Sequence, residues 1–203
     1  KASAKVQVVM SNSAKKLILA STSVYRRELL DRLRIPFEVI SPQVDETPLP
    51  GESTLALALR LAKAKAAAVA KDHPKAWVIG SDQVADLCGA AIGKPGNFER
   101  AMAQLQLMRG ATVTFQTALC LMRGDVETTV NIPTEVTFRK LSDDVLEAYL
   151  HAEEPYDCAG SAKSEGLGIS LLESIQSNDP TALIGLPLIA LTGLLRDAGF
   201  VIP

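Results

Sequence analysis

The chain has 203 residues, of which 47% are hydrophobic and 22% charged, so its composition excludes a disordered, collagen-like or low-complexity chain. The length allows either one larger domain or two lobes. The formal net charge is −2, but without the four lysines that precede residue 17 the chain has 17 basic and 23 acidic residues. An acidic body disfavours nucleic acids and anionic membranes as partners, because they need clustered Lys and Arg, yet it allows a local pocket for a small anion.

The first part of the chain predicts strands that alternate with helices. An apolar run over residues 16–20 ends at Ser21-Thr-Ser23, and leucines with helical spacing follow, which indicates a buried strand, a polar turn and a helix. Residues 37–40 predict a second strand. Ser53 is expected to cap a long Ala/Leu-rich helix that ends near Lys71, before a His-Pro pair.

The middle of the chain predicts a third strand, a helix and a hairpin. Residues 77–79 form a buried strand that runs into Gly80-Ser-Asp-Gln83, and residues 84–87 would continue it toward a turn. Asn97 is expected to cap a helix that ends near Gly110. Residues 111–140 are rich in β-branched side chains around an Arg-Gly-Asp turn, which predicts a β-hairpin.

The last part returns to helices. Ser142 precedes an acidic first helical turn, which suits the positive end of a helix dipole. A loop rich in Gly, Ser, Lys and Glu over residues 160–168 leads into an apolar run over 169–175, and a final helix follows Pro187. The alternation with one hairpin predicts an α/β or mixed α+β fold, in which residues 10–203 form a single domain.

Cysteine usage and hydropathy indicate a cytoplasmic protein. The three cysteines, Cys88, Cys120 and Cys158, are an odd number without C-x-x-C spacing, so they suggest neither a disulfide framework nor a zinc ribbon. The most apolar stretch, residues 183–195, is interrupted by two glycines and a proline and is too short to span a membrane, so a core helix is expected. Residues 1–9 are interpreted as a non-native remnant before Met10.

Three polar clusters follow apolar runs, where open α/β sheets place their ligand crevices. The first cluster, residues 21–27, combines hydroxyls, a helix N-terminus and two arginines, which would suit a phosphate chain. The alternative has about equal weight: Ser23 caps the helix, and Arg26 and Arg27 point into solvent.

The second and third clusters carry carboxylates and lysines. Asp45-Glu46 and Asp82 offer the oxygen ligands that Mg²⁺ or Mn²⁺ prefers, or a base that activates water, although loop acids are more often solvated. Asp82 directly follows a buried run and is therefore expected at the rim of the sheet. Lys94 lies in a Gly-Lys-Pro turn without the glycine spacing of a P-loop, and taken alone it is more readily a turn lysine.

In combination, these clusters resemble the Maf family of nucleoside triphosphate pyrophosphatases. The resemblance covers nearly everything after residue 15 and implies a twisted mixed sheet that forms two lobes around a cleft, and a homodimer. The motifs that carry it are Leu17-Ile-Leu-Ala-Ser-Thr-Ser23, Arg26, Val44-Asp-Glu46, Leu61-Ala-Lys63, Lys65-Ala66, Ile79-Gly-Ser-Asp-Gln83, Gly93-Lys-Pro95 and Ala159-Gly-Ser161 with Lys163 and Glu165.

The resemblance also implies a branch of the family. Tyr25, Gln83 and Glu165 look like the branch that hydrolyses 7-methyl-GTP, whereas the thymidine and uridine branch has Arg, Thr and Gln there. A 7-methylated guanine is positively charged, which favours an aromatic face, and a carboxylate can accept from its ring N–H and exocyclic amine. Two positions depart from the pattern: Val24 replaces the usual Pro, and Tyr25 stands where this branch often has Trp.

By resemblance, the reaction is metal-dependent cleavage of the α–β phosphoanhydride to a nucleoside monophosphate and pyrophosphate. Asp82 would be the proton acceptor, and Glu46 would hold Mg²⁺, Mn²⁺ or Co²⁺ together with Asp82; whether Asp82 removes the proton or orients the water stays open. Two rival functions are a pyrophosphatase of the pyrimidine branch and a non-catalytic nucleotide-binding regulator of septum formation. The residues expected to contact phosphates are Ser21, Arg26, Lys65, Lys94 and Lys163.

Overall fold

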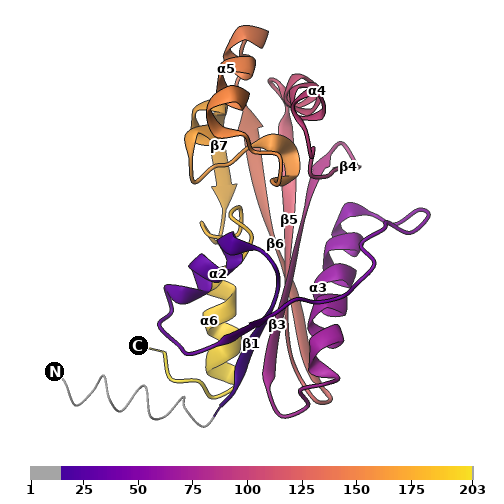
Figure 1. Ribbon diagram of the computed structural model, residues 1–203, viewed down its shortest axis with the longest axis vertical. Helices are drawn as coiled ribbons and strands as arrows, with labels where there is room; N and C mark the ends of the chain where they lie inside the picture. The colour runs from indigo at the N-terminus through magenta and orange to yellow at the C-terminus, as the bar shows by residue number, and fades with distance from the viewer. Residues whose placement is uncertain (1–14, 203) are drawn as a thin grey trace, which may run out of the picture.

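The computed structural model describes residues 15–202, so the interpretation of residues 1–9 lies outside the described residues. Within that part, seven strands form one mixed sheet in the order β2-β1-β3-β5-β6-β7, and β4 pairs with β3. The three long strands β3 (Trp77–Leu87), β5 (Thr112–Arg123) and β6 (Val126–Phe138) run through the length of the molecule (Figure 1). The predicted mixed α/β fold is therefore confirmed.

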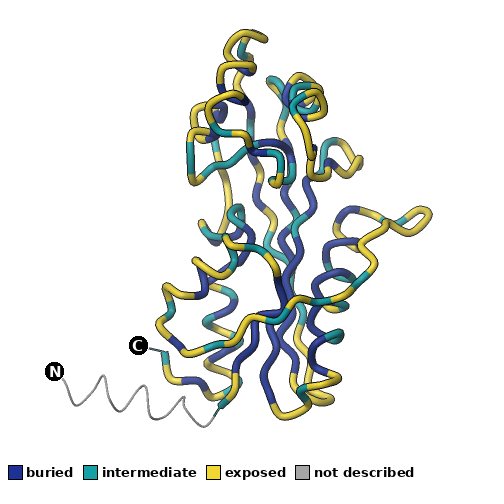
Figure 2. Tube along the Cα trace, in the orientation of Figure 1, coloured by how far each residue is buried: buried dark blue, intermediate teal, exposed yellow. Residues whose placement is uncertain are grey.

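One end of the sheet is covered by helices on both faces. The short strands β1 (Leu17–Ala20) and β2 (Glu38–Ile40) are parallel to each other, and β1 is parallel to β3. Alternate residues of β1 pack against α3 (Thr54–Ala70) on one face, and the others pack against α6 (Leu188–Asp197) and α2 (Val24–Asp31) on the opposite face. Burial on both faces explains why β1 is a continuous apolar run (Figure 2).

The other end of the sheet has its own hydrophobic cluster. There β4 (Ala90–Ile92) and the edge strand β7 (Leu172–Ser177) complete the sheet, and α4 (Phe98–Met108) and α5 (Asp143–Glu153) pack beside each other. Two 3₁₀ segments, η1 (Ala159–Ser161) and η2 (Leu167–Leu171), lie in the connection between α5 and β7. No helix in residues 15–202 is long and apolar enough to cross a membrane.

Close packing of α3 on the sheet depends on small residues. Ala58, Ala62, Ala66 and Ala70 form a buried stripe at intervals of four residues, the spacing of one helix face. A Cβ atom on Gly80 of β3 would lie 2.7 Å from the backbone nitrogen of Ala66 and still closer to the carbonyl oxygen of Ala62. The helix therefore approaches the strand at a distance that only glycine permits.

The position of Asp82 differs from the expected one. It lies in the middle of β3 rather than at the rim of the sheet, and only 6% of its surface is exposed. Pairing of β3 with β1 stops at Gly80, whereas pairing with β5 continues through Asp86, so the strand extends beyond its short neighbour. Asp82 thus lies just past the carboxyl end of β1, on a part of β3 that is still paired with β5.

The other predicted elements agree with the structure, except that the core helix expected over residues 183–195 begins only at Leu188. Ser53 caps α3 through its side chain, and Asn97 caps α4 in the same way. The hairpin of β5 and β6 turns at Gly124 and Asp125, and α6 follows Pro187 as expected. The remaining short helix, α2 (Val24–Asp31), begins after Ser23, whose hydroxyl accepts a hydrogen bond from the Arg26 backbone.

Candidate functional site

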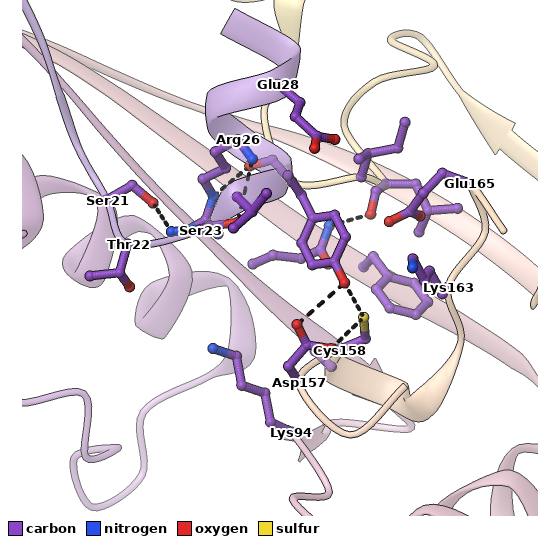
Figure 3. A pocket seen from close by; sticks show the side chains of 18 of the residues that line it. Ser21, Thr22, Ser23, Arg26, Glu28, Lys94, Asp157, Cys158, Lys163 and Glu165 are labelled. Carbon is purple, nitrogen blue, oxygen red and sulfur yellow. Dashed lines mark hydrogen bonds between the residues drawn. The ribbon is translucent and has the colours of Figure 1, made fainter. Parts of the chain in front are cut away.

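A cleft of about 850 Å³ opens between the N-terminus of α2 and the loops at the α4–α5 end of the sheet (Figure 3). Asp82 does not line the cleft; its carboxylate lies directly behind Lys65. Nine of the ten residues proposed from the sequence line this cleft: Ser21, Tyr25, Arg26, Glu46, Lys65, Gln83, Lys94, Lys163 and Glu165.

The N-terminus of α2 is held by local hydrogen bonds. The Ser21 hydroxyl accepts from the Ser23 backbone at 3.0 Å, and the Ser21 backbone N–H donates to Ile40 of β2 at 3.1 Å. The capping alternative for Ser23 is thus confirmed, whereas Arg26 is partly buried and its Nε donates to the Gly185 carbonyl at 2.8 Å. Burial lowers the pKa of Arg26, and the nearby carboxylates oppose that shift.

Gly185 connects α2 to the sheet. Its carbonyl oxygen accepts from Arg26 and also from the Ser81 hydroxyl of β3, at 3.0 Å. Gly185 has a φ of +124°, in the left-handed region that favours glycine. The loop before α6 therefore orients the Arg26 guanidinium into the cleft.

Lys65 joins the two carboxylates that the sequence singles out. Its Nζ lies 2.7 Å from Glu46 Oε1 and 2.7 Å from Asp82 Oδ1, although only 7% of Lys65 is exposed. Burial raises the pKa of the Asp82 carboxyl, and the positive charges of Lys65 and Arg26 only partly offset this shift. Burial also acts to raise the pKa of Glu46, but its hydrogen bond to Lys65 and the charges of Lys65, Lys94 and Arg26 outweigh it and lower the pKa.

Glu46 and Asp82 fit a divalent cation whose remaining coordination positions are filled by the substrate and water. Among the described residues, no group of three or more His, Cys, Asp or Glu side chains is arranged to hold a metal ion. Mg²⁺ is usually bound by one or two carboxylates together with substrate phosphates and water, rather than by a full protein cage. Glu46 and Asp82 both contact the Lys65 ammonium, and the Glu46 side chain is exposed.

Lys94 reaches the cleft from the α4–α5 end. Its loop is tied to the segment before η1, because Gly96 donates to the Tyr156 carbonyl at 3.0 Å. Gln104 of α4 strengthens this connection, since its amide donates to Gly93 at 3.0 Å and accepts from the Ser161 hydroxyl at 2.6 Å. Nothing in the sequence singles out Gln104, because a polar residue on a helix gives no local sign of such a contact.

Tyr25 crosses the cleft to the opposite wall. Its hydroxyl donates to Asp157 Oδ2 at 3.3 Å, and the Cys158 thiol lies 4.0 Å from the Tyr25 hydroxyl oxygen. Lys163 places its ammonium 5.6 Å from the centre of the Tyr25 ring and pairs with Glu153 at 3.1 Å. Sequence reasoning missed Asp157, since nothing local pairs it with a residue 132 positions earlier.

The side chains around Tyr25 differ in character from those near Asp82. Figure 3 shows Lys163 and Glu165 together on one side of the cleft, with Lys94 and Ser21 on the other. Gln83 lies at the floor of the cleft, where its amide donates to the carbonyl oxygens of Ala182 and Leu183 at 3.0 and 2.9 Å. The cleft thus has a cationic end, where Arg26, Lys65 and Lys94 lie with Glu46, and an aromatic end, where carboxylates and Lys163 surround Tyr25.

This chain is similar to several known proteins. A family model described as Maf-like protein matches residues 16–198. A protein of Cupriavidus metallidurans named 7-methyl-GTP pyrophosphatase is 62% identical over 94% of this chain and 96% of its own length. A protein of the same name from Ralstonia nicotianae is also 62% identical, over 91% of this chain and 96% of its own length. Among solved structures, the Ham1 protein of Staphylococcus aureus matches with a TM-score of 0.46 and 15% identity, over 62% of this chain and 73% of that chain.

Proposed function

This chain belongs to the Maf family, and from that premise we propose that it hydrolyses the α–β phosphoanhydride of 7-methyl-GTP, giving 7-methyl-GMP and pyrophosphate. The observation that carries the proposal is the cleft itself, which has three cationic side chains at one end, with the buried Asp82 carboxylate in contact with one of them, and an aromatic ring with carboxylates and Lys163 at the other. The names of the two relatives support the same substrate.

The cationic end suits a triphosphate. In phosphoryl transfer the protein mainly positions the reactants and stabilises negative charge on the phosphate oxygens. Arg26, Lys65 and Lys94 supply that charge, and the Ser21 hydroxyl and α2 N-terminus add hydrogen-bond donors. Lys163 lies farther toward Tyr25, where it would contact a phosphate only if its pairing with Glu153 changed.

Asp82 is the proposed proton acceptor for the attacking water. A base works best when its pKa is close to the operating pH, and burial shifts the pKa of Asp82 upward, in that direction. The contact with Lys65 at 2.7 Å acts against this rise and favours the ionised form of the carboxylate. We propose that Glu46 and Asp82 hold Mg²⁺, Mn²⁺ or Co²⁺, a cation that would neutralise phosphate charge when bound.

The aromatic end suits a cationic base. Tyr25 would stack on the methylated guanine, and Glu165, which is exposed on its loop, would accept from the ring N–H and the amine. Gln83 supports the loop of residues 182–185 beneath them, so its proposed influence on specificity acts partly through that loop. A pyrimidine offers neither the positive charge nor the paired donors.

The test measures pyrophosphate release from 7-methyl-GTP and from UTP, with each of the three metals and with EDTA. We expect a ratio of kcat/KM that favours 7-methyl-GTP, and loss of activity in EDTA that Mg²⁺ or Mn²⁺ restores. Tyr25→Ala and Glu165→Gln should each lower the ratio, by about 1–3 kcal/mol in transition-state binding. A wild-type ratio below one would assign the chain to the pyrimidine branch, and nucleotide binding without turnover would indicate the regulator.

Three further features of the protein are part of the proposal. We propose that residues 10–203 are one domain with two packed lobes, and the support for this is that β3, β5 and β6 pass through both ends of the sheet in residues 15–202. The enzyme is cytoplasmic and acts as a homodimer without nucleic-acid or membrane partners. Light scattering should therefore give twice the chain mass of 21.6 kDa, and a mass of one chain would contradict the dimer.

A further inference from the structure

The hydroxyl of Tyr25 distinguishes this site from one in which the aromatic residue is Trp. Tyr25 stands where Trp is frequent in this branch, and a phenol presents a smaller face to a cation than an indole does. Unlike Trp, however, Tyr carries a hydroxyl that can be polarised by an acceptor on the opposite wall of the cleft. The structure places an acceptor on that hydroxyl: Asp157 Oδ2, at 3.3 Å.

We propose that Asp157 is a positioning residue for base selection. Through its contact with the Tyr25 hydroxyl it makes the Tyr25 ring a better stacking partner for a positively charged base, and so it favours 7-methylguanine over guanine. The inference rests on the proposed function and extends it to the discrimination between the methylated and the unmethylated nucleotide. Asp157 acts in two ways: it fixes the ring across the cleft, and it increases the negative potential at the ring face.

The fixing role follows from where the two residues lie. Tyr25 is in the first turn of α2, at the α3–α6 end, and Asp157 lies between α5 and η1, at the other end. The hydrogen bond therefore spans the cleft (Figure 3). Burial raises the pKa of Tyr25, and the neighbouring Cys158 and Asp157 raise it further, so the phenol keeps its proton and remains a donor.

The electrostatic role follows from the direction of that hydrogen bond. A phenol that donates to a carboxylate gains electron density in its ring, and a cation over the ring face is attracted by that density. The Lys163 ammonium already lies 5.6 Å from the ring centre, so this ring accepts a cation in the structure itself. Glu153 compensates the charge of Lys163 at 3.1 Å.

The thiol beside this contact does not compete with it. Cys158 Sγ lies 3.5 Å from Asp157 Oδ1 and 4.0 Å from the Tyr25 hydroxyl. Burial raises the pKa of Cys158 to about 12, with a further contribution from the charge of Asp157. The thiol is therefore neutral at physiological pH, and the carboxylate is the acceptor of the phenol proton.

The experiment measures the Kd of 7-methyl-GMP and of GMP by calorimetry, and in parallel the turnover of the two triphosphates. Asp157→Ala and Tyr25→Phe should each reduce the preference for the methylated nucleotide about three- to tenfold. Because both remove the same hydrogen bond, the double variant should lose no more than the larger single loss. Asp157→Asn, which keeps an acceptor without the charge, should lose part of the preference, and Asp157→Glu should recover part of what Ala loses.

Asp125→Asn is the matched control, because it removes an exposed carboxylate from the distant β5–β6 turn. It should leave the preference within twofold of the wild type. The proposal is wrong if Asp157→Ala also stays within twofold, or if the losses of Asp157→Ala and Tyr25→Phe add in the double variant. Turnover distinguishes failure of this inference from failure of the proposed function. A protein that binds 7-methyl-GMP selectively through Asp157 but hydrolyses neither triphosphate contradicts the proposed function and not this inference.

Discussion

Among single residues, Asp82 is the proposed base of the hydrolysis reaction. Its carboxylate is buried on β3, and Lys65 holds it at 2.7 Å. Asp82→Asn keeps the shape of the side chain but removes its charge and basicity. We expect kcat to fall by about 10²-fold or more while nucleotide binding survives, as measured by steady-state kinetics and calorimetry. A variant with near-normal kcat would exclude Asp82 as the base.

Lys65 should set the pH at which the enzyme loses activity in acid. Asp82 must be ionised to accept a proton, so kcat/KM should fall as the pH drops through the pKa of Asp82, which burial raises above its ordinary value. Lys65→Gln removes the charge that offsets this rise, so the acid limb of kcat/KM should move to higher pH. The position of the limb is the readout, because the overall rate will also fall.

Lys63→Gln provides the matched control for this measurement. Lys63 lies on the same helix, but it is exposed and pairs with Glu127 at 2.9 Å, on the hairpin. Its substitution should leave the acid limb where it is in the wild type. A limb that moves equally in both variants would show that general charge, rather than the contact with Asp82, controls it.

On the scale of elements, the packing of α3 against β3 determines where Lys65 meets Asp82. Gly80→Ala would place a methyl group 2.7 Å from the Ala66 backbone and closer still to Ala62, so helix and strand must separate. We expect the free energy of unfolding to decrease by about 1–3 kcal/mol, measured in urea. Activity should fall as well, because the separation shifts Lys65 relative to β3.

The same substitution at Gly193 should have the opposite effect on stability. Gly193 lies within α6, and a Cβ atom there would meet nothing within 4 Å. Alanine is a better helix former than glycine, so Gly193→Ala should increase the free energy of unfolding by about 0.5–1 kcal/mol. If Gly80→Ala were equally stabilising, the close approach of α3 to β3 would not be a constraint on the fold.

On the scale of the whole molecule, one cleft is lined from both ends of the sheet. The α2 turn comes from one end, and the segment of residues 157–166 comes from the other. Binding of 7-methyl-GMP should therefore slow amide hydrogen exchange in residues 21–27 and in residues 156–166 together, with the β5–β6 turn as an unaffected reference. Protection confined to one of the two segments would show that the nucleotide does not span the cleft.

Much of the architecture could be predicted from the sequence, because it depends on residues near one another along the chain. Apolar runs such as residues 17–20 indicated buried strands, and Ser53 and Asn97 indicated where helices begin. The clusters that contain Ser21, Arg26 and Lys94 were identified by their position after apolar runs and by their resemblance to one family. Nine of the ten residues chosen in this way line a single cleft.

Only the tertiary structure decided how these side chains meet. Asp82 was expected at the rim of the sheet, but it lies within β3, because β5 continues to pair with that strand after β1 has ended. The contact of Lys65 with Asp82 depends on a helix approaching a glycine of another element, and that of Tyr25 with Asp157 joins residues 132 positions apart. Local patterns report on neighbours within a few residues, whereas these distances are set by strand pairing and helix packing between distant segments.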